Sequence, residues 1–193
     1  MNRKMNIVIV GLGNIGSYFY NYLKQNKKNI YNKTNTTPNI LFVSARSFKK
    51  KRNFLLPKKI WLKNYLSATK MKEVDIISFH ARLTSENFHM MGKYQFNLVK
   101  PGLLLVNTAR AELINQEELL ESMNNGQVSA AAIDVISPEP PFDSKPEEHD
   151  FHHILLSHPK IHVTPHIGAS TIDAQNRISI DICNQIIDNW SEK

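Results

Sequence analysis

Short apolar runs alternate with amphipathic segments along this chain, and the alternation predicts strands and helices in turn. An apolar run of about four to eight residues between turn residues is typical of a buried strand. Six such runs lie at residues 7–10, 40–43, 75–79, 103–107, 129–136 and 161–163. Strands alternating with helices favour a parallel sheet, so the predicted fold class is α/β, a doubly wound parallel sheet.

The expected helices follow from apolar side chains that recur every three or four residues. After the first strand, Ile15, Phe19, Tyr22 and Leu23 share one face, whereas residues 24–39 lack this period and suggest an exposed loop. Further helices are expected near residues 67–72, at 115–124 and at the end of the chain. Asn115 with Glu118 resembles a capping box, Leu119, Leu120 and Met123 follow on one side, and the last helix, begun by Ser170 or Thr171, carries Ile178, Ile182, Ile186 and Trp190 as a ridge.

Three glycines follow the first strand at the spacing of a phosphate-binding turn. Gly11 would permit a tight turn, Gly13 would let the backbone approach a pyrophosphate, and Gly16 would allow close packing of helix on strand. A helix N-terminus here, at Asn14 and Ile15, offers free N–H groups to the phosphates. This context predicts dinucleotide binding; the alternative is an ordinary structural turn.

Charge is distributed unevenly. The first 72 residues hold 16 of the 24 Lys and Arg and no acid, whereas the remaining residues hold 8 with all 17 acids, so the two parts carry +16 and −9. This asymmetry indicates an anionic partner for the first part, either a phosphorylated cofactor or a nucleic acid. Nucleic-acid binding is the weaker reading, because the basic part lacks interleaved aromatic or helical readers.

The end of the second strand bears on which cofactor is bound. NAD-selective sites place Asp or Glu there for the ribose hydroxyls, but this chain has no acid before Glu73. It has Ser44, Arg46 and Ser47, followed by Lys49–Arg52, which suit a 2′-phosphate. The cofactor is therefore expected to be NADP or NAD, with NADP favoured. A solvated basic loop is the alternative.

Three ordered motifs in the second half resemble D-isomer-specific 2-hydroxyacid dehydrogenases, including phosphoglycerate dehydrogenase, over residues 76–190. They run from Val99 to Arg110, from Ala131 to Pro140 and from Thr164 to Gly168. The resemblance implies a Rossmann-type NAD(P)-binding domain and hydride transfer between nicotinamide and a 2-hydroxyacid or 2-oxoacid.

Catalytic roles follow from that resemblance. Arg110 would clamp the substrate carboxylate and polarise its carbonyl, His166 would be the general acid, and Glu139 would orient His166. Asp134 would accept from the nicotinamide amide. Taken singly, each residue could instead be a surface charge, a turn residue or a strand cap. The full set of expected cofactor contacts is Gly11, Gly13, Asn14, Ile15, Gly16, Ser44, Arg46, Ser47, His80, Thr108, Ala109, Arg110, Asp134, His166 and Gly168.

The chain also departs from the family pattern. Arg82 stands where the family has Pro, and Ala111 stands where Gly usually follows the Arg, which is tolerable only if φ is not positive. Only ten residues precede Gly11, so we expect one domain over residues 1–193 without the family's substrate domain, and a catalytically impaired cofactor-binding fragment or sensing module is the alternative function. Residues 1–75 moderately resemble the N-terminus of homoserine dehydrogenase, which would place a join near residues 70–78.

The remaining expectations are exclusions and a partner. A single cysteine, Cys183, allows no internal disulfide and favours a reducing cytoplasm. No apolar run is long enough to cross a bilayer. Four histidines between His149 and His158 lack a clear ligand geometry, so no metal is assigned. The expected partners are a small 2-oxoacid or 2-hydroxyacid and, by family analogy, a second copy in a homodimer, with no nucleic acid and no membrane.

Overall fold

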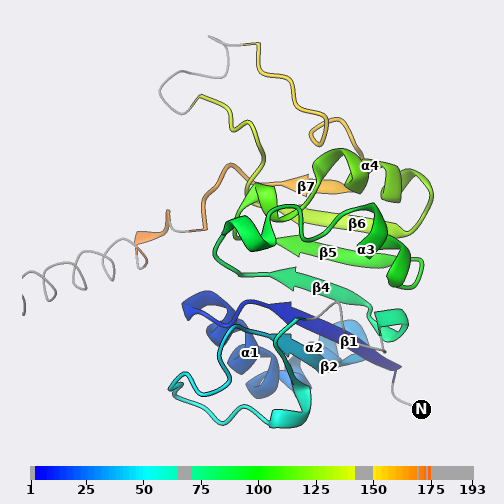
Figure 1. Cartoon of the computed structure of the whole chain (residues 1–193). Coiled ribbons are helices and arrows are strands. Elements are labelled where there is room, and N and C mark those ends of the chain that lie inside the picture. Colours follow the sequence, from blue (N-terminus) through cyan, green and yellow to red (C-terminus); the bar gives the residue numbers. More distant parts are fainter. Residues whose placement is uncertain (1–2, 65–70, 142–149, 169, 173, 175–193) are drawn as a thin grey trace, which may run out of the picture.

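Residues buried on both sides of the strands build a parallel sheet with helices on its two faces. The computed structural model describes residues 3–64, 71–141, 150–168, 170–172 and 174. Its seven strands lie in the order β3-β2-β1-β4-β5-β6-β7, and every neighbouring pair is parallel (Figure 1). The predicted doubly wound sheet is confirmed.

The strands are β1 (Arg3–Val10), β2 (Thr36–Ser44), β3 (Trp61–Leu62), β4 (Ile76–Phe79), β5 (Leu103–Asn107), β6 (Val128–Ile133) and β7 (Ile161–Val163). The α-helices are α1 (Asn14–Gln25), α2 (Lys27–Thr34), α3 (Lys93–Leu98) and α4 (Gln116–Asn124). Short 3-10 turns occupy η1 (Lys58–Ile60), η3 (Met71–Glu73), η4 (Ser85–Asn87) and η5 (Ala111–Leu113). No helix in these described segments is long and apolar enough to cross a membrane.

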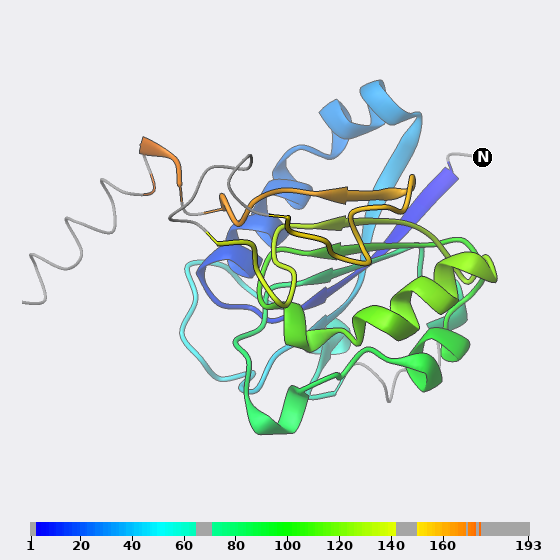
Figure 2. The same ribbon diagram turned by 90° about the horizontal axis from the view of Figure 1, so that it is seen from above.

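Strand β1 contributes side chains to two apolar clusters. Val8 and Val10 belong to the cluster that contains the β4, β5 and α4 side chains, whereas Ile7 and Ile9 join Tyr20 of α1 in the other. Successive residues of a strand point to opposite faces, so this alternation places helices on both sides of the sheet. Figure 2 shows α1 and α2 on one face and α3 and α4 on the other.

Topology places a ligand-binding edge between β1 and β4. From β1 the chain first runs outward through β2 and β3, and it then returns to β4 on the other side of β1 before continuing to β7. Open α/β sheets bind ligands at such a reversal, outside the carboxyl ends of the strands. The sheet is continuous there, and a join near residues 70–78 stays a prediction.

Two element predictions at the front were wrong in whole or in part. Residues 24–39 are not one exposed loop, because they form α2 and the start of β2. The face predicted for α1 was wrong in part: Leu23 is buried and Phe19 packs against the core as expected, but Ile15 and Tyr22 are exposed and Gly16 and Tyr20 are buried instead. The helix is rotated from the predicted face because Gly16 must lie against the carbonyl oxygen of Gly11.

Other boundaries differ less. The strand expected at residues 129–136 is β6 and ends at Ile133. Asn115 caps α4 by accepting from the backbone N–H of Glu118 at 3.1 Å, but the Glu118 carboxylate accepts from the backbone N–H of Lys93, so only half of the capping box forms. Most of the helix predicted near residues 67–72, and nearly all of the closing helix, lies outside the described residues; Thr171 Oγ1 does accept from the Ala174 N–H.

Candidate cofactor and catalytic site

The glycine turn lies at the reversal point of the sheet. Gly11 has φ +95° and donates its N–H to the Ser44 carbonyl at the end of β2. A Cβ on Gly11 would lie 2.5 Å from the backbone of Ala81, and one on Gly16 would lie 2.1 Å from the Gly11 oxygen. Both positions therefore require glycine: at Gly11 the chain passes directly against the chain after β4, and at Gly16 the helix lies against the Gly11 carbonyl.

Gly13 differs from these two glycines because its side-chain direction is open. No atom lies within 4 Å of a Cβ built there. Gly13 is the N-cap of α1, which has neither a side-chain cap nor an acidic residue in its first turn. The first N–H groups of α1 thus have no side-chain cap, and the space beside Gly13 is open, an arrangement that suits an anion.

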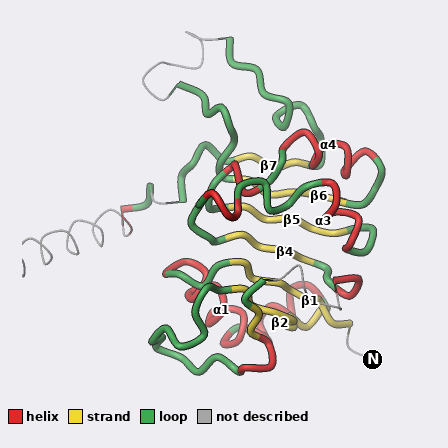
Figure 3. The backbone as a smooth tube through the Cα atoms, in the orientation of Figure 1, coloured by secondary structure: helices red, strands yellow, loops and turns green. Residues whose placement is uncertain are grey.

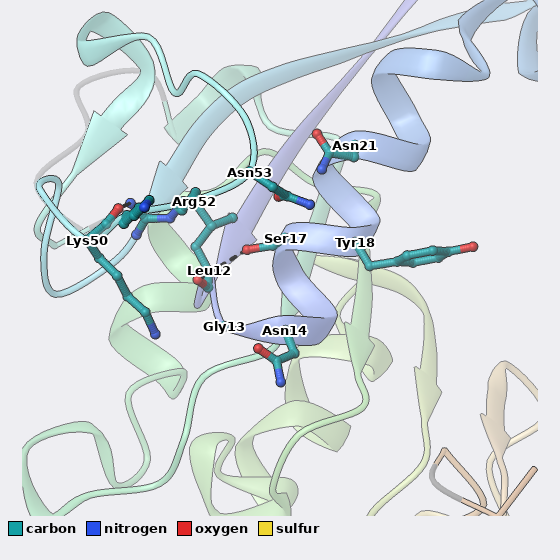
Figure 4. Close-up of a pocket in the computed structure, with 10 residues that line it drawn as sticks. Leu12, Gly13, Asn14, Ser17, Tyr18, Asn21, Lys50, Arg52 and Asn53 are labelled. Atoms are coloured by element: carbon teal, nitrogen blue, oxygen red, sulfur yellow. Dashed lines mark hydrogen bonds between the residues drawn. The ribbon is translucent and has the colours of Figure 1, made fainter. Parts of the chain in front are cut away.

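A pocket of about 390 Å³ opens between this turn and the basic loop after β2 (Figure 4). It is lined by Leu12, Gly13, Asn14, Ser17, Tyr18, Asn21, Lys50, Lys51, Arg52 and Asn53. Three of these residues are basic and none is acidic. In Figure 4, Asn53 points from the loop toward α1, and the Tyr18 ring extends from α1 away from the loop.

Aromatic contacts hold the basic loop in place. Most of the chain between β2 and β3 is loop (Figure 3). Phe54 stacks on Tyr20 of α1 with ring centroids 4.7 Å apart, and Phe48 packs on Trp61 at 5.6 Å. Arg52 closes the loop by donating to the carbonyls of residues 47, 48 and 50. Arg52 thus mainly stabilises the loop conformation. Lys50 and Lys51 provide the ammonium groups of the pocket.

The cofactor contacts predicted at Ser44, Arg46 and Ser47 stay a prediction, and none of the three residues lines this pocket. Arg46 and Ser47 are exposed and do not line the pocket. Ser44 is buried, and its hydroxyl donates to the Lys63 carbonyl. The pocket residues Lys50 and Lys51 were visible only as part of a charge run, because nothing in the sequence shows which lysines the loop turns inward.

His80 packs beneath the glycine turn. Its Nε2 lies 2.8 Å from Ser78 Oγ, its Nδ1 lies 3.2 Å from Thr108 Oγ1, and its ring packs on Phe19. Burial lowers the pKa of His80 from 6.5 to about 4, because the surroundings disfavour the charged ring. The residue is therefore a neutral element of the turn at physiological pH.

This lowered pKa predicts an acid-sensitive fold. Below pH 6.5 His80 is protonated in the unfolded chain, whereas in the folded chain it stays neutral down to about pH 4. Its contribution to the free energy of unfolding is therefore complete above pH 6.5 and is lost as the pH falls toward 4. We expect the free energy of unfolding in urea to fall by about 2 kcal/mol from pH 7 to pH 4.5 through this group. His80→Gln should lose that part of the dependence, and His162→Gln, at an exposed position, should retain it. An unchanged slope in His80→Gln would refute the assignment.

At the same edge of the sheet, the segments that follow β6 and β7 bring Glu139 and His166 together. His166 Nδ1 lies 3.0 Å and 3.2 Å from the two carboxylate oxygens of Glu139. A carboxylate only accepts, so Nδ1 carries the proton and Nε2 is left for a reacting group. Both side chains are about one-third exposed, at 38% and 34%.

Asp134 organises the loop that carries His166. The buried carboxylate accepts from Thr164 Oγ1, from the N–H of Ile167 at 3.0 Å and from the N–H of Gly168 at 3.0 Å. Its own carbonyl accepts from the N–H of His166, whose φ is +50°. This structural role accompanies the predicted contact with nicotinamide, which stays a prediction.

Arg110 lies at the end of β5 and forms no hydrogen bond or ion pair with either Glu139 or His166. Its Nη1 donates to the Ala109 carbonyl at 2.6 Å, and its own carbonyl accepts from Asn107 Nδ2. Ala111 begins η5 without a positive φ, so the condition set for an alanine there is met. Among the described residues, no three His, Cys, Asp or Glu side chains gather as a metal site.

A parallel sheet whose strand order reverses between β1 and β4, with a glycine turn at the reversal, defines a dinucleotide-binding domain. Residues 2–168 match the family model described as D-isomer specific 2-hydroxyacid dehydrogenase, NAD binding domain. The chain belongs to that family, and the predicted resemblance and Rossmann-type fold are confirmed.

Individual relatives agree. Hydroxypyruvate reductase of Thermotoga maritima is 40% identical over 118 residues, which are 61% of this chain and 37% of that protein. D-3-phosphoglycerate dehydrogenase of Bacillus subtilis is 35% identical over 130 residues, 67% of this chain and 23% of the relative. The crystal structure of D-lactate dehydrogenase with NAD+ from Lactobacillus jensenii superposes with a TM-score of 0.68 at 25% identity, covering 94% of this chain and 52% of that one. The chain thus spans well under half the length of these two curated relatives.

Proposed function

We propose that this chain binds a nicotinamide dinucleotide at its glycine turn and carries the proton-transfer half of a 2-hydroxyacid dehydrogenase. The observation that carries the proposal is the Glu139–His166 pair, held at the carboxyl edge of the same sheet whose reversal point bears the glycine turn. When bound, the cofactor supplies or accepts a hydride. The residues fit it, because the uncapped start of α1 and the open space at Gly13 suit a pyrophosphate.

His166 is the proton donor in the reductive direction. With Nδ1 bound to Glu139, its protonated ring presents Nε2–H to the carbonyl oxygen of a 2-oxoacid, and it takes the proton back in the oxidative direction. The Glu139 carboxylate fixes the ring orientation and stabilises the imidazolium that this cycle requires.

Arg110 holds the substrate. It is exposed at the end of β5, and its single side-chain hydrogen bond within the described residues, to Ala109, leaves guanidinium donors for a carboxylate. A bidentate contact there orients the 2-oxoacid and polarises its carbonyl. The family resemblance also leads us to propose a homodimer.

The finer part of the proposal is a preference for NADP. Its support is the pocket beside the glycine turn, where Lys50 and Lys51 provide positive charge and no acid is present to accept from ribose hydroxyls. The family description names NAD, so the two cofactors must be compared directly.

Fluorescence titration of the full chain with NADPH and NADH tests cofactor binding. We expect saturable binding of both and tighter binding of NADPH. Lys50→Glu should weaken NADPH about tenfold, the size of one charge-assisted hydrogen bond, and NADH less. Lys49→Glu makes the same charge change outside the pocket and should have a smaller effect. Equal or tighter binding of NADH would refute the NADP preference, and no binding of either would refute the proposed function.

A further inference from the structure

The backbone of Ser137, close in sequence to Glu139 of the proposed catalytic pair, is held by a single side chain. Glu139 follows Ser137 by two residues. Gln116 Nε2 donates to the Ser137 carbonyl at 2.7 Å, and Gln116 Oε1 accepts from the Ser137 N–H at 3.2 Å. The amide of Gln116 thus pairs with this residue as a neighbouring strand would.

A histidine forms a further hydrogen bond to the Ser137 backbone. His153 Nε2 lies 3.1 Å from the Ser137 carbonyl, and the N–H of Leu155 donates to His153 Nδ1 at 3.2 Å. Because Nδ1 accepts, Nε2 must be the nitrogen that donates to Ser137. The Ser137 carbonyl therefore receives two donors, and its position is determined by α4 on one side and by the segment at residues 151–155 on the other.

Gln116 is itself tied to the loop that carries Arg110. It is the first residue of α4, after the N-cap Asn115, whose N–H donates to the Met91 carbonyl. Only the 3-10 turn η5 and one further residue, Ile114, separate Asn115 from Arg110, and that turn is closed by the Leu113 N–H donating to the Arg110 carbonyl. Short, bonded backbone therefore connects the end of β5 to the side chain that holds the segment after β6.

We propose that Gln116 is a positioning residue that places Glu139 against His166 and fixes the distance of this pair from Arg110. This inference rests on the proposed function for the catalytic purpose of the pair, whereas the hydrogen bonds that position the pair do not depend on that function. Glu139 is partly exposed, and its only described side-chain partner is His166, so its backbone must be held for the pair to persist. A site must be held by a supporting layer of hydrogen bonds to keep productive geometry.

The test reads the protonated nitrogen of His166 directly. In the ¹⁵N-labelled full chain at about pH 8.5, where histidines are ordinarily neutral, ring ¹⁵N shifts report which nitrogen carries hydrogen, and His166→Gln assigns the signal. The wild type should show His166 protonated at Nδ1, facing Glu139. Glu139→Leu sets the signature of a ring without that acceptor.

Gln116→Met keeps the volume and helix preference of the side chain but removes both bonds to Ser137. We expect the ratio of the Nδ1–H to the Nε2–H form of His166 to fall about tenfold, roughly the size of one lost net hydrogen bond. Gln116→Glu keeps the acceptor for the Ser137 N–H but places a carboxylate oxygen against the Ser137 carbonyl, and should lower the ratio at least as far. Glu117→Gln, at the next, exposed position of α4, should match the wild type.

An unchanged His166 ratio in folded Gln116→Met would overturn the proposal, as would a wild-type ring protonated at Nε2. If Gln116→Met does not fold, Gln116→Glu decides by the same ratio. The readout needs neither cofactor nor substrate, so a chain that fails to turn over can still confirm the positioning role. Conversely, a retained ratio alongside measurable turnover would overturn this inference and leave the proposed function intact.

Discussion

Replacing Gly16 by alanine should unfold the glycine turn. The new Cβ would lie 2.1 Å from the backbone oxygen of Gly11, a contact that no side-chain rotation can relieve. Either α1 moves away from β1 or the Gly11 turn opens, and both changes disturb the buried contacts of Tyr20 and Leu23. We expect a loss of at least about 3 kcal/mol in the free energy of unfolding.

Gly13→Ala is the matched control, since it adds the same methyl group three residues earlier. Nothing lies within 4 Å of that methyl, and Gly13 has φ −80°, which alanine adopts without strain. We therefore expect the fold to change by less than about 1 kcal/mol, the range of an N-cap exchange. Under the proposed function, however, this methyl occupies the approach of the pyrophosphate, so Gly13→Ala should lose dinucleotide affinity while remaining folded.

Urea unfolding followed by circular dichroism separates the two variants. Equal stability of Gly16→Ala and Gly13→Ala would contradict the close contact at Gly16. Retention of full cofactor affinity by Gly13→Ala would contradict the placement of the phosphates at this turn.

Much of this fold was predictable because its signals are local. A strand buried on both faces reads as an apolar run, and the glycine spacing marks the turn after β1. The orientation of α1 was not predictable in this way. Ile15 and Tyr22 have the right helical spacing for a core face, yet the requirement that Gly16 touch Gly11 points Tyr20 inward instead.

α2 was missed for a related reason. Its residues are Asn-rich and Lys-rich and none is buried, so no apolar period reveals it. Its Ile30 packs against the core but is only partly buried. The helix ends at Asn35, whose backbone is left-handed, and the sequence shows only that an Asn, which tolerates this conformation, stands there.

The candidate site was predictable in its residues more than in its supports. Glu139 and His166 were expected to pair from the resemblance, and they do. The roles of Gln116 and Lys50 depend on which backbone group or pocket each faces, and that is set by tertiary packing far from either residue in sequence. Asp134 shows the same limit, because its three loop bonds could not be read from its place at a strand end.

The second large effect concerns His166 itself. If His166 donates the proton, then His166→Gln, which cannot donate as an acid, should lower the rate of 2-oxoacid reduction by about 10²–10⁴-fold, the usual contribution of a general acid. Dinucleotide affinity should change little by comparison, because the glycine turn is untouched. Glu139→Gln should lower the rate in the same direction, since a neutral amide stabilises the imidazolium less.

The most direct test of the account is oxidation of NADPH or NADH by the full chain with a panel of 2-oxoacids, followed by loss of cofactor absorbance. Wild-type protein should oxidise cofactor with at least one member of the panel, His166→Gln should lose that activity, and His162→Gln, at an exposed position on β7, should keep it. Tight cofactor binding without oxidation anywhere in the panel would contradict the account and would favour a cofactor-binding module instead.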